Sequence, residues 1–146
     1  MAIQLNGSEK PDFQNPEKVR NALIELMSFL GFRTGEIVYV FIDKKAMIKL
    51  NTEVLDHRYA TDIITFNESV NKRIYCDIFL CPEVIMENAQ RFKVNFETEL
   101  FRVMVHGLLH CMGWNDVTEK EKTDMRIAEE KALKFLHVSR ETNTYL

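Results

Sequence analysis

The apolar residues of this chain change repeatedly between extended and helical spacing, and this alternation is what most constrains its fold. Positions 36–43 are rich in Val, Ile, Tyr and Phe, which is typical of a largely buried strand. Val19, Leu23 and Leu26 recur instead at the spacing of a helix. Along the 146 residues, the pattern predicts strands at 3–5, 36–43, 62–66 and 74–80, and helices at 16–30, 44–55, 82–93, 96–112 and 119–136.

Capping residues mark where several of these helices begin. Asp43 and Asn95 are the expected caps of two helices, and Thr118 with Glu121 has the spacing of a capping box. The elements follow the order β-α-β-α-β-β-α-α-α, with no internal repeat and no linker between them. We therefore predict one α+β domain over the whole chain (1–146), with about five helices packed on a small mixed sheet of about four strands.

Composition and charge exclude several classes of protein. The chain has 19 basic and 22 acidic residues and a pI of about 5.8, so it lacks the broad positive field of a protein that coats nucleic acid. The longest apolar run, 37–42, is too short to span a bilayer, and the first residues do not resemble a signal peptide. These features predict a cytoplasmic protein with no membrane partner. Cys76, Cys81 and Cys111 include no C-x-x-C pair and are expected to be reduced core thiols.

Two histidines four residues apart, on the helix predicted at 96–112, form the most informative motif. The rings of His106 and His110 would lie on one helix face, where two imidazole nitrogens can reach the same metal ion. Gly113 can end the helix and let the chain turn back, which would present Asp116 as a third ligand. Two histidines and a carboxylate leave a fourth position open, as in catalytic zinc sites. The alternative, that both histidines are surface or hydrogen-bonded core residues, is left open by the spacing alone.

A similar spacing occurs in metalloproteases with the motif H-E-x-x-H-x-x-G-x-x-H/D, whose glutamate serves as the general base. Here the glutamate position is occupied by Gly107, which can neither take a proton nor orient a water molecule. Peptidase activity would need a base from elsewhere in the chain, so the sequence disfavours it.

The residues around the two histidines resemble a known family signature. The stretch 106–114, H-G-L-L-H-C-M-G-W, is similar to the H-G-x-L-H-L-x-G-Y-D-H signature of the YbeY family, which are bacterial endoribonucleases that act in ribosomal RNA maturation. Further segments with counterparts in that family are L-N at 50–51, H-R at 57–58, T-D-I-I-T-F at 61–66 and C-D-I-F-L at 76–80. The resemblance extends over most of the chain, to the end of the last predicted helix.

The resemblance implies a metal-dependent endoribonuclease with one Zn²⁺ per chain; the donor set also suits another transition metal such as Fe(II). It implies that Arg58 is a catalytic residue whose guanidinium binds the scissile phosphate and stabilises its developing charge. His57 is a further candidate for contacting RNA, and Arg102, one turn before His106, is a candidate for binding phosphate. Asp116 stands where the family signature has histidine, and its negative charge should leave a bound water less acidic.

These residues lead to one hypothesis and two alternatives. The hypothesis is a single-strand-acting endoribonuclease in ribosomal RNA processing, with ribosomal RNA, the ribosome and ribosome-associated proteins as partners. One alternative is a zincin-type hydrolase of peptides or small molecules that uses the same ligands. The other is a non-catalytic ribosome assembly factor, in which the metal only fixes the last two helices.

Overall fold

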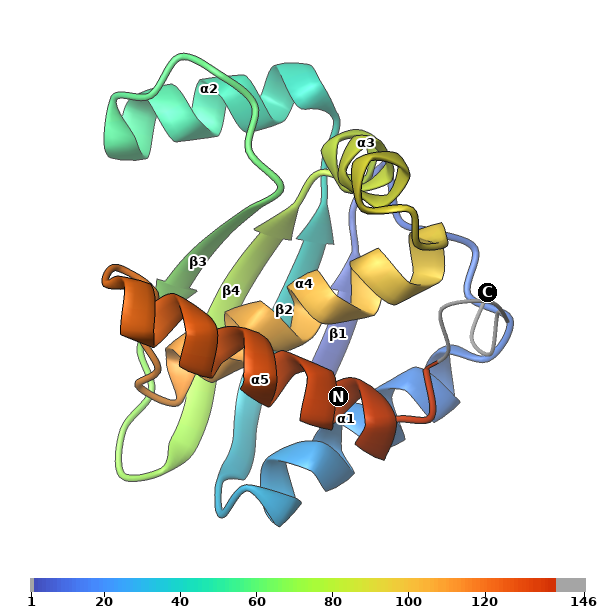
Figure 1. Ribbon diagram of the computed structural model, residues 1–146, viewed down its shortest axis with the longest axis vertical. Helices are drawn as coiled ribbons and strands as arrows, with labels where there is room; N and C mark the ends of the chain where they lie inside the picture. Colours follow the sequence, from blue (N-terminus) through green and yellow to red (C-terminus); the bar gives the residue numbers. More distant parts are fainter. Residues whose placement is uncertain (1, 139–146) are drawn as a thin grey trace.

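The computed structural model describes residues 2–138 as a β-sheet with helices packed on it (Figure 1). Within these residues the chain forms four strands and five helices in the order β-α-β-α-β-β-α-α-α, which confirms the predicted fold class. The tail at 139–146, which the sequence predicts to fray, lies outside the described residues. In the described part of the chain, none of the helices has the length and apolar character needed to cross a membrane.

The sheet combines parallel and antiparallel pairs of strands. Its members are β1 (Ile3–Asn6), β2 (Arg33–Phe41), β3 (Ile63–Asn67) and β4 (Arg73–Leu80). Their spatial order is β1-β2-β4-β3, in which β1, β2 and β4 run parallel while the edge strand β3 runs antiparallel to β4. β3 and β4 form the hairpin that the sequence predicts.

The helices are α1 (Pro16–Phe29), α2 (Lys44–Leu55), α3 (Pro82–Phe92), α4 (Phe96–Cys111) and α5 (Glu119–Phe135). The predicted caps are present. The side chains of Asp43 and Asn95 each accept a hydrogen bond of 2.8 Å from a backbone N–H in the first turn of α2 and α4, respectively. Thr118 and Glu121 form the reciprocal capping box at the start of α5. Each cap satisfies N–H groups that have no partner within the helix.

β2 differs from the prediction at both ends. It begins at Arg33 rather than at 36 because Arg33 pairs with Arg73 of the neighbouring strand β4. It ends at Phe41 rather than at 43 because Asp43 serves as the cap of α2 and is no longer part of the strand. The local pattern therefore predicted the strand, whereas its length depends on pairing and on the next helix.

One face of the sheet is buried under helices. Ile37 and Tyr39 of β2 and Ile78 of β4 belong to the main core, together with buried residues of α1, α4 and α5. Figure 1 shows α4 crossing the sheet, and α5 packs against α4. Met47 of α2 belongs to a second cluster with Ile64 of β3, whose side chain points to the opposite face from that of its neighbour Ile63.

α4 approaches the sheet closely at Gly107. A Cβ atom placed on Gly107 would lie 2.9 Å from Cδ1 of Ile63 and 3.1 Å from Cδ1 of Ile78. Because Gly107 has no side chain, α4 can lie against β3 and β4 at this point, which lies between His106 and His110 along the helix. The position that holds the glutamate in metalloproteases is thus a packing position in this protein.

A Gly107→Glu variant is expected to lower the free energy of unfolding by about 3 kcal/mol or more, because it buries a charged carboxylate without a partner. Thermal unfolding followed by circular dichroism would measure this loss as a lower Tm. Gly107→Ala is the matched control, since it adds only the Cβ atom and gains helix propensity, so its effect should be much smaller. A Gly107→Glu protein with the wild-type Tm would contradict the close packing described here.

The three cysteines are buried and free, in agreement with the prediction of core thiols. Cys76 lies on β4 and interacts with Cys111 at the end of α4. The hydrogen bond with the Cys111 thiol, together with burial, raises the pKa of the Cys76 thiol well above its ordinary value. Because the thiolate is the form that binds metal, Cys76 is a poor candidate for a ligand.

Candidate metal centre

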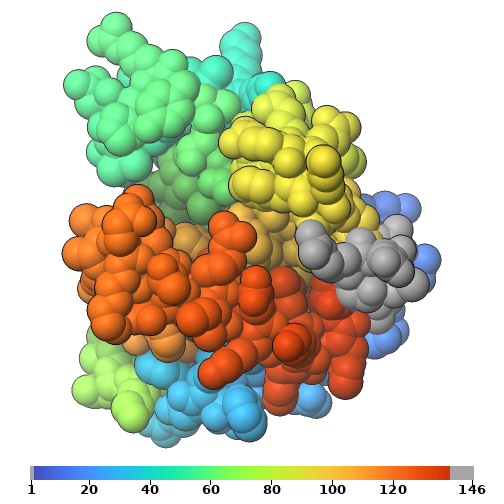
Figure 2. Space-filling model, in the orientation of Figure 1, coloured from blue at the N-terminus to red at the C-terminus, as the bar shows by residue number. Residues whose placement is uncertain are grey.

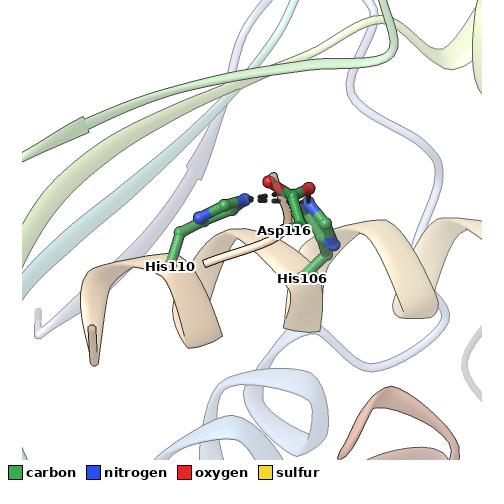
Figure 3. A group of neighbouring side chains, drawn as sticks. All are labelled: His106, His110 and Asp116. Atoms are coloured by element: carbon green, nitrogen blue, oxygen red, sulfur yellow. Dashed lines mark hydrogen bonds and ion pairs between the residues drawn. The ribbon is translucent and has the colours of Figure 1, made fainter. Parts of the chain in front are cut away.

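α4 presents His106 and His110 on one side, one helical turn apart (Figure 3). The centroids of the two rings are 4.6 Å apart, and their Nε2 atoms are 3.0 Å apart. Both side chains are partly buried, with exposed fractions of 17% for His106 and 31% for His110. The shared face expected from the spacing of the two histidines is therefore present.

The loop after α4 adds a third donor. Gly113 has a φ of +100°, which a residue with a side chain rarely adopts, and the next residue donates its backbone N–H to the last turn of α4 at 3.0 Å. This turn leads the chain back towards the histidines. Oδ2 of Asp116 lies 3.3 Å from Nε2 of His106 and 3.5 Å from Nε2 of His110. Figure 3 shows the carboxylate between the two rings.

The three donor atoms fit an ion of the size and preference of zinc. A tetrahedral ion at about 2.0–2.1 Å from its nitrogen and oxygen ligands holds two ligand atoms about 3.3–3.4 Å apart. The three separations here are 3.0, 3.3 and 3.5 Å, so one ion can reach all three atoms after small adjustments. His106, His110 and Asp116 are thus a group that could hold a metal ion. Three protein ligands leave one tetrahedral position for another molecule.

Glu129 of α5 contacts His106 from the other side of the ring, and the sequence pattern did not predict this contact. Its Oε2 lies 2.5 Å from Nδ1 of His106, and its side chain is 2% exposed. A carboxylate at Nδ1 favours the tautomer with the proton on that nitrogen, which leaves Nε2 free to bind a metal. Burial raises the pKa of the Glu129 carboxyl, but the hydrogen bond from His106 and the charge of Arg102 outweigh it, so the net pKa is lowered. Glu129 is therefore ionised and orients His106.

Arg102 is engaged by two carboxylates. Its Nη1 donates to Glu129 at 2.8 Å, while Nε and Nη2 donate to Glu99 at 2.9 Å and 2.5 Å. Its side chain is 17% exposed, and both carboxylates are almost fully buried. These contacts give Arg102 a structural role, which is to hold Glu129 against His106. The phosphate contact predicted for Arg102 stays a prediction.

A Glu129→Gln variant is expected to bind metal about 10- to 100-fold more weakly, as is typical when the hydrogen-bond partner of a metal-binding histidine is changed. The amide removes the negative charge that favours the required tautomer of His106. Competition with a chromogenic chelator would measure the dissociation constant. Glu130→Gln is the matched control, because Glu130 is the next residue on α5 and is exposed. Equal affinities for the two variants would show that Glu129 does not orient His106.

His57 and Arg58 lie in the loop between α2 and β3, and both are exposed. Within the described residues, no hydrogen bond or ion pair joins them to the three-donor cluster of His106, His110 and Asp116. The guanidinium of Arg58 has no hydrogen-bond or ion-pair partner at all among these residues. The loop leads into Ile63, which packs against Gly107 on α4. In Figure 2 the green surface of this loop faces the orange surface of the chain after α4 across a recess. The structure therefore brings together the predicted metal ligands and places Arg58 on a neighbouring segment.

Comparisons with known proteins place this chain in a family. The family described as "Endoribonuclease YbeY" matches residues 4–137. A protein of that name from Phocaeicola vulgatus is 35% identical over 93% of this chain and 98% of its own length. Another, from Porphyromonas gingivalis strain W83, is 41% identical over 78% of this chain and 76% of its own length.

A solved structure shares the fold. The solution structure of TM1509 from Thermotoga maritima superposes with a TM-score of 0.66 at 23% identity, covering 92% of this chain and 88% of that chain. The family match covers nearly all of the described residues, and the relatives match at well over 30% identity across most of their length. This chain is a member of the endoribonuclease YbeY family.

Proposed function

We propose that this protein is a metal-dependent endoribonuclease whose metal is held by His106, His110 and Asp116. The observation that carries the proposal is the convergence of three donor atoms from α4 and the following loop, at separations of 3.0–3.5 Å. Membership of a family whose relatives are named endoribonucleases supports RNA as the substrate. Zinc is the proposed ion, because nitrogen and carboxylate donors in this arrangement suit it; Fe(II) is the alternative.

Each side chain has a defined part in this proposal. A divalent ion at the cluster would supply Lewis-acid chemistry towards a phosphodiester. Glu129 keeps His106 in the tautomer that binds the ion, and Arg102 keeps Glu129 in place. Arg58 binds the scissile phosphate, because a guanidinium can form two parallel hydrogen bonds to it and stabilise the charge that builds on its oxygens. Its exposed position and its lack of a partner among the described residues suit this role.

The biological setting that we propose is ribosomal RNA processing in the cytoplasm, with single-stranded ribosomal RNA or the ribosome as the partner. The net charge of −3 supports a partner-guided enzyme, because little overall positive charge is available to bind RNA non-specifically. Specificity would then come from local contacts and from proteins bound to the ribosome.

Side-by-side digestion tests the reaction class. Zinc-loaded protein is incubated with single-stranded RNA, casein and a small phosphodiester, and the products are separated on gels or measured by absorbance. We expect cleavage of RNA and no cleavage of casein, because Gly107 replaces the general base of metalloproteases. Cleavage of casein with intact RNA would favour a zincin-type hydrolase. A protein that cuts none of the substrates but supports ribosomal RNA processing in cells would favour an assembly factor.

A further inference from the structure

The loop before β3 carries a stacked pair of exposed rings. The rings of His57 and Tyr59 have centroids 5.3 Å apart and planes inclined by 14°, and the Tyr59 hydroxyl lies 3.1 Å from Nδ1 of His57. Tyr59 is 57% exposed, although an aromatic side chain gains most when it is buried. The metal cluster does not use this pair, so its exposure needs a separate explanation.

Hydrogen bonds from the end of α2 hold this loop in place. Nδ2 of Asn51 donates to the backbone oxygen of Tyr59 at 2.9 Å. The backbone N–H of His57 also donates to the carbonyl of Asn51, at 3.2 Å. Asn51 is 1% exposed, so it anchors the loop from within the protein. The rings are therefore presented to solvent by a fixed backbone, which lowers the entropy lost when a ligand stacks on them.

A cation accompanies the two rings. Arg58 lies between His57 and Tyr59 in the sequence, is exposed, and has no hydrogen-bond or ion-pair partner within residues 2–138. Aromatic rings for stacking bases, combined with positive charge for phosphates, are the means by which proteins bind single-stranded nucleic acid. A duplex keeps its bases stacked inside the helix, so it cannot use such a ring.

A short stretch of chain joins the rings to a residue that packs beside the metal centre. Tyr59 precedes Ile63 by four residues, which limits the distance between their Cα atoms to about 14 Å. Ile63 packs against Gly107, and Gly107 lies between the two histidines of the cluster on α4. The recess visible in Figure 2 separates this loop from the chain after α4. A short single-stranded segment can therefore cross from the rings to the cluster.

We propose that Tyr59, backed by His57, is a stacking platform for an unpaired base next to the phosphate bound by Arg58. The inference rests on the proposed endoribonuclease function and narrows its substrate to RNA with at least one unstacked base at this position. Tyr59 would be a binding residue that selects single strands over duplexes, and it would take no part in the bond cleavage itself.

Fluorescence anisotropy with labelled oligonucleotides tests this proposal. The probes are a single-stranded RNA, an abasic strand of the same length and an RNA duplex, each checked on a denaturing gel after the measurement to establish that it is intact. Tyr59→Ala is expected to bind the single-stranded RNA about 5- to 150-fold more weakly, the range typical for loss of one stacked base. Its affinity for the abasic strand and for the duplex should equal that of the wild type. Tyr59→Phe, which keeps the ring, should bind like the wild type.

The matched control is Tyr75→Ala. Tyr75 is also exposed, at 40%, and lies on β4 next to Cys76, whose side chain is buried on the helix-covered face. Because neighbouring side chains on a strand point to opposite faces, Tyr75 lies on the face away from α4, and its replacement should leave binding unchanged.

Two results would overturn the proposal that Tyr59 stacks on an unpaired base. One is wild-type affinity of Tyr59→Ala for single-stranded RNA, and the other is an equal loss on the abasic strand. The binding assay does not depend on cleavage. Failure of the endoribonuclease proposal would therefore appear separately, as a wild-type protein that binds RNA but never cuts it.

Discussion

Replacing Arg58 by alanine is expected to lower RNA cleavage by about 10²–10³-fold, the loss typical when one donor to the developing charge of a transition state is removed. The reason is that the guanidinium of Arg58 is exposed and has no partner in the described part of the chain, so its charge is available to a phosphate. Because Arg58 makes no hydrogen bond or ion pair with the three-donor cluster, its loss should leave the metal content unchanged. Initial rates on single-stranded RNA, with metal content measured on the same samples, would test both expectations.

Two further variants sharpen this test. Arg58→Lys keeps the positive charge but cannot form bidentate hydrogen bonds to a phosphate, so it should retain only part of the activity. Arg91→Ala removes an exposed arginine from α3 and should cleave at the wild-type rate. If Arg58→Ala lost its metal together with its activity, Arg58 would belong to the metal site. If it cleaved RNA normally, Arg58 would not be a catalytic residue.

Replacing His110 by alanine is expected to abolish metal binding and, with it, RNA cleavage. His110 supplies one of only three donor atoms in the cluster, and Nε2 of this residue lies within 3.5 Å of both other donors. With two donors left, the ion would rely on solvent for half of its tetrahedral shell. His110 is the less buried of the two histidines, so the variant should remain folded.

Metal content measured by mass spectrometry on gently purified protein would test this second expectation. The matched control is His137→Asn, which removes an exposed histidine beyond α5 and keeps a residue that tolerates the positive φ of 59° at this position. Circular dichroism would establish that both variants are folded. Wild-type metal content in folded His110→Ala protein would remove His110 from the ligand set.

Local sequence patterns predicted the elements of this fold because their causes are local. Asp43 and Asn95 cap the helices that follow them, since a short polar side chain can accept a hydrogen bond from the first turn wherever the helix later packs. The order of the elements followed from the same patterns. The length of β2 did not, because the pairing of Arg33 with Arg73 joins residues far apart in the chain.

The same distinction separates the predicted part of the metal centre from the missed part. His106, His110 and Asp116 lie within one helix and the turn after it, so their convergence could be read from spacing and from Gly113. Glu129 lies on another helix and meets His106 only through tertiary packing.

One signal for Glu129 was present in the sequence. Glu129 shares the buried stripe of α5 with Met125, Ala132 and Leu133, and an acidic residue within an apolar stripe needs a partner. The partner itself could not be read from the sequence. For Arg102, the position one turn before His106 was correct, but its two carboxylate partners were missed for the same reason.

RNA cleavage by this protein is expected to depend on a metal ion held by His106, His110 and Asp116. The most direct test measures cleavage of single-stranded RNA by the wild-type protein after removal of metal with a chelator, and again during titration with Zn²⁺. We expect no cleavage by the metal-free protein and recovery that saturates at about one equivalent of metal per chain, as one three-ligand site requires. Undiminished cleavage by fully metal-free protein would contradict this dependence on metal.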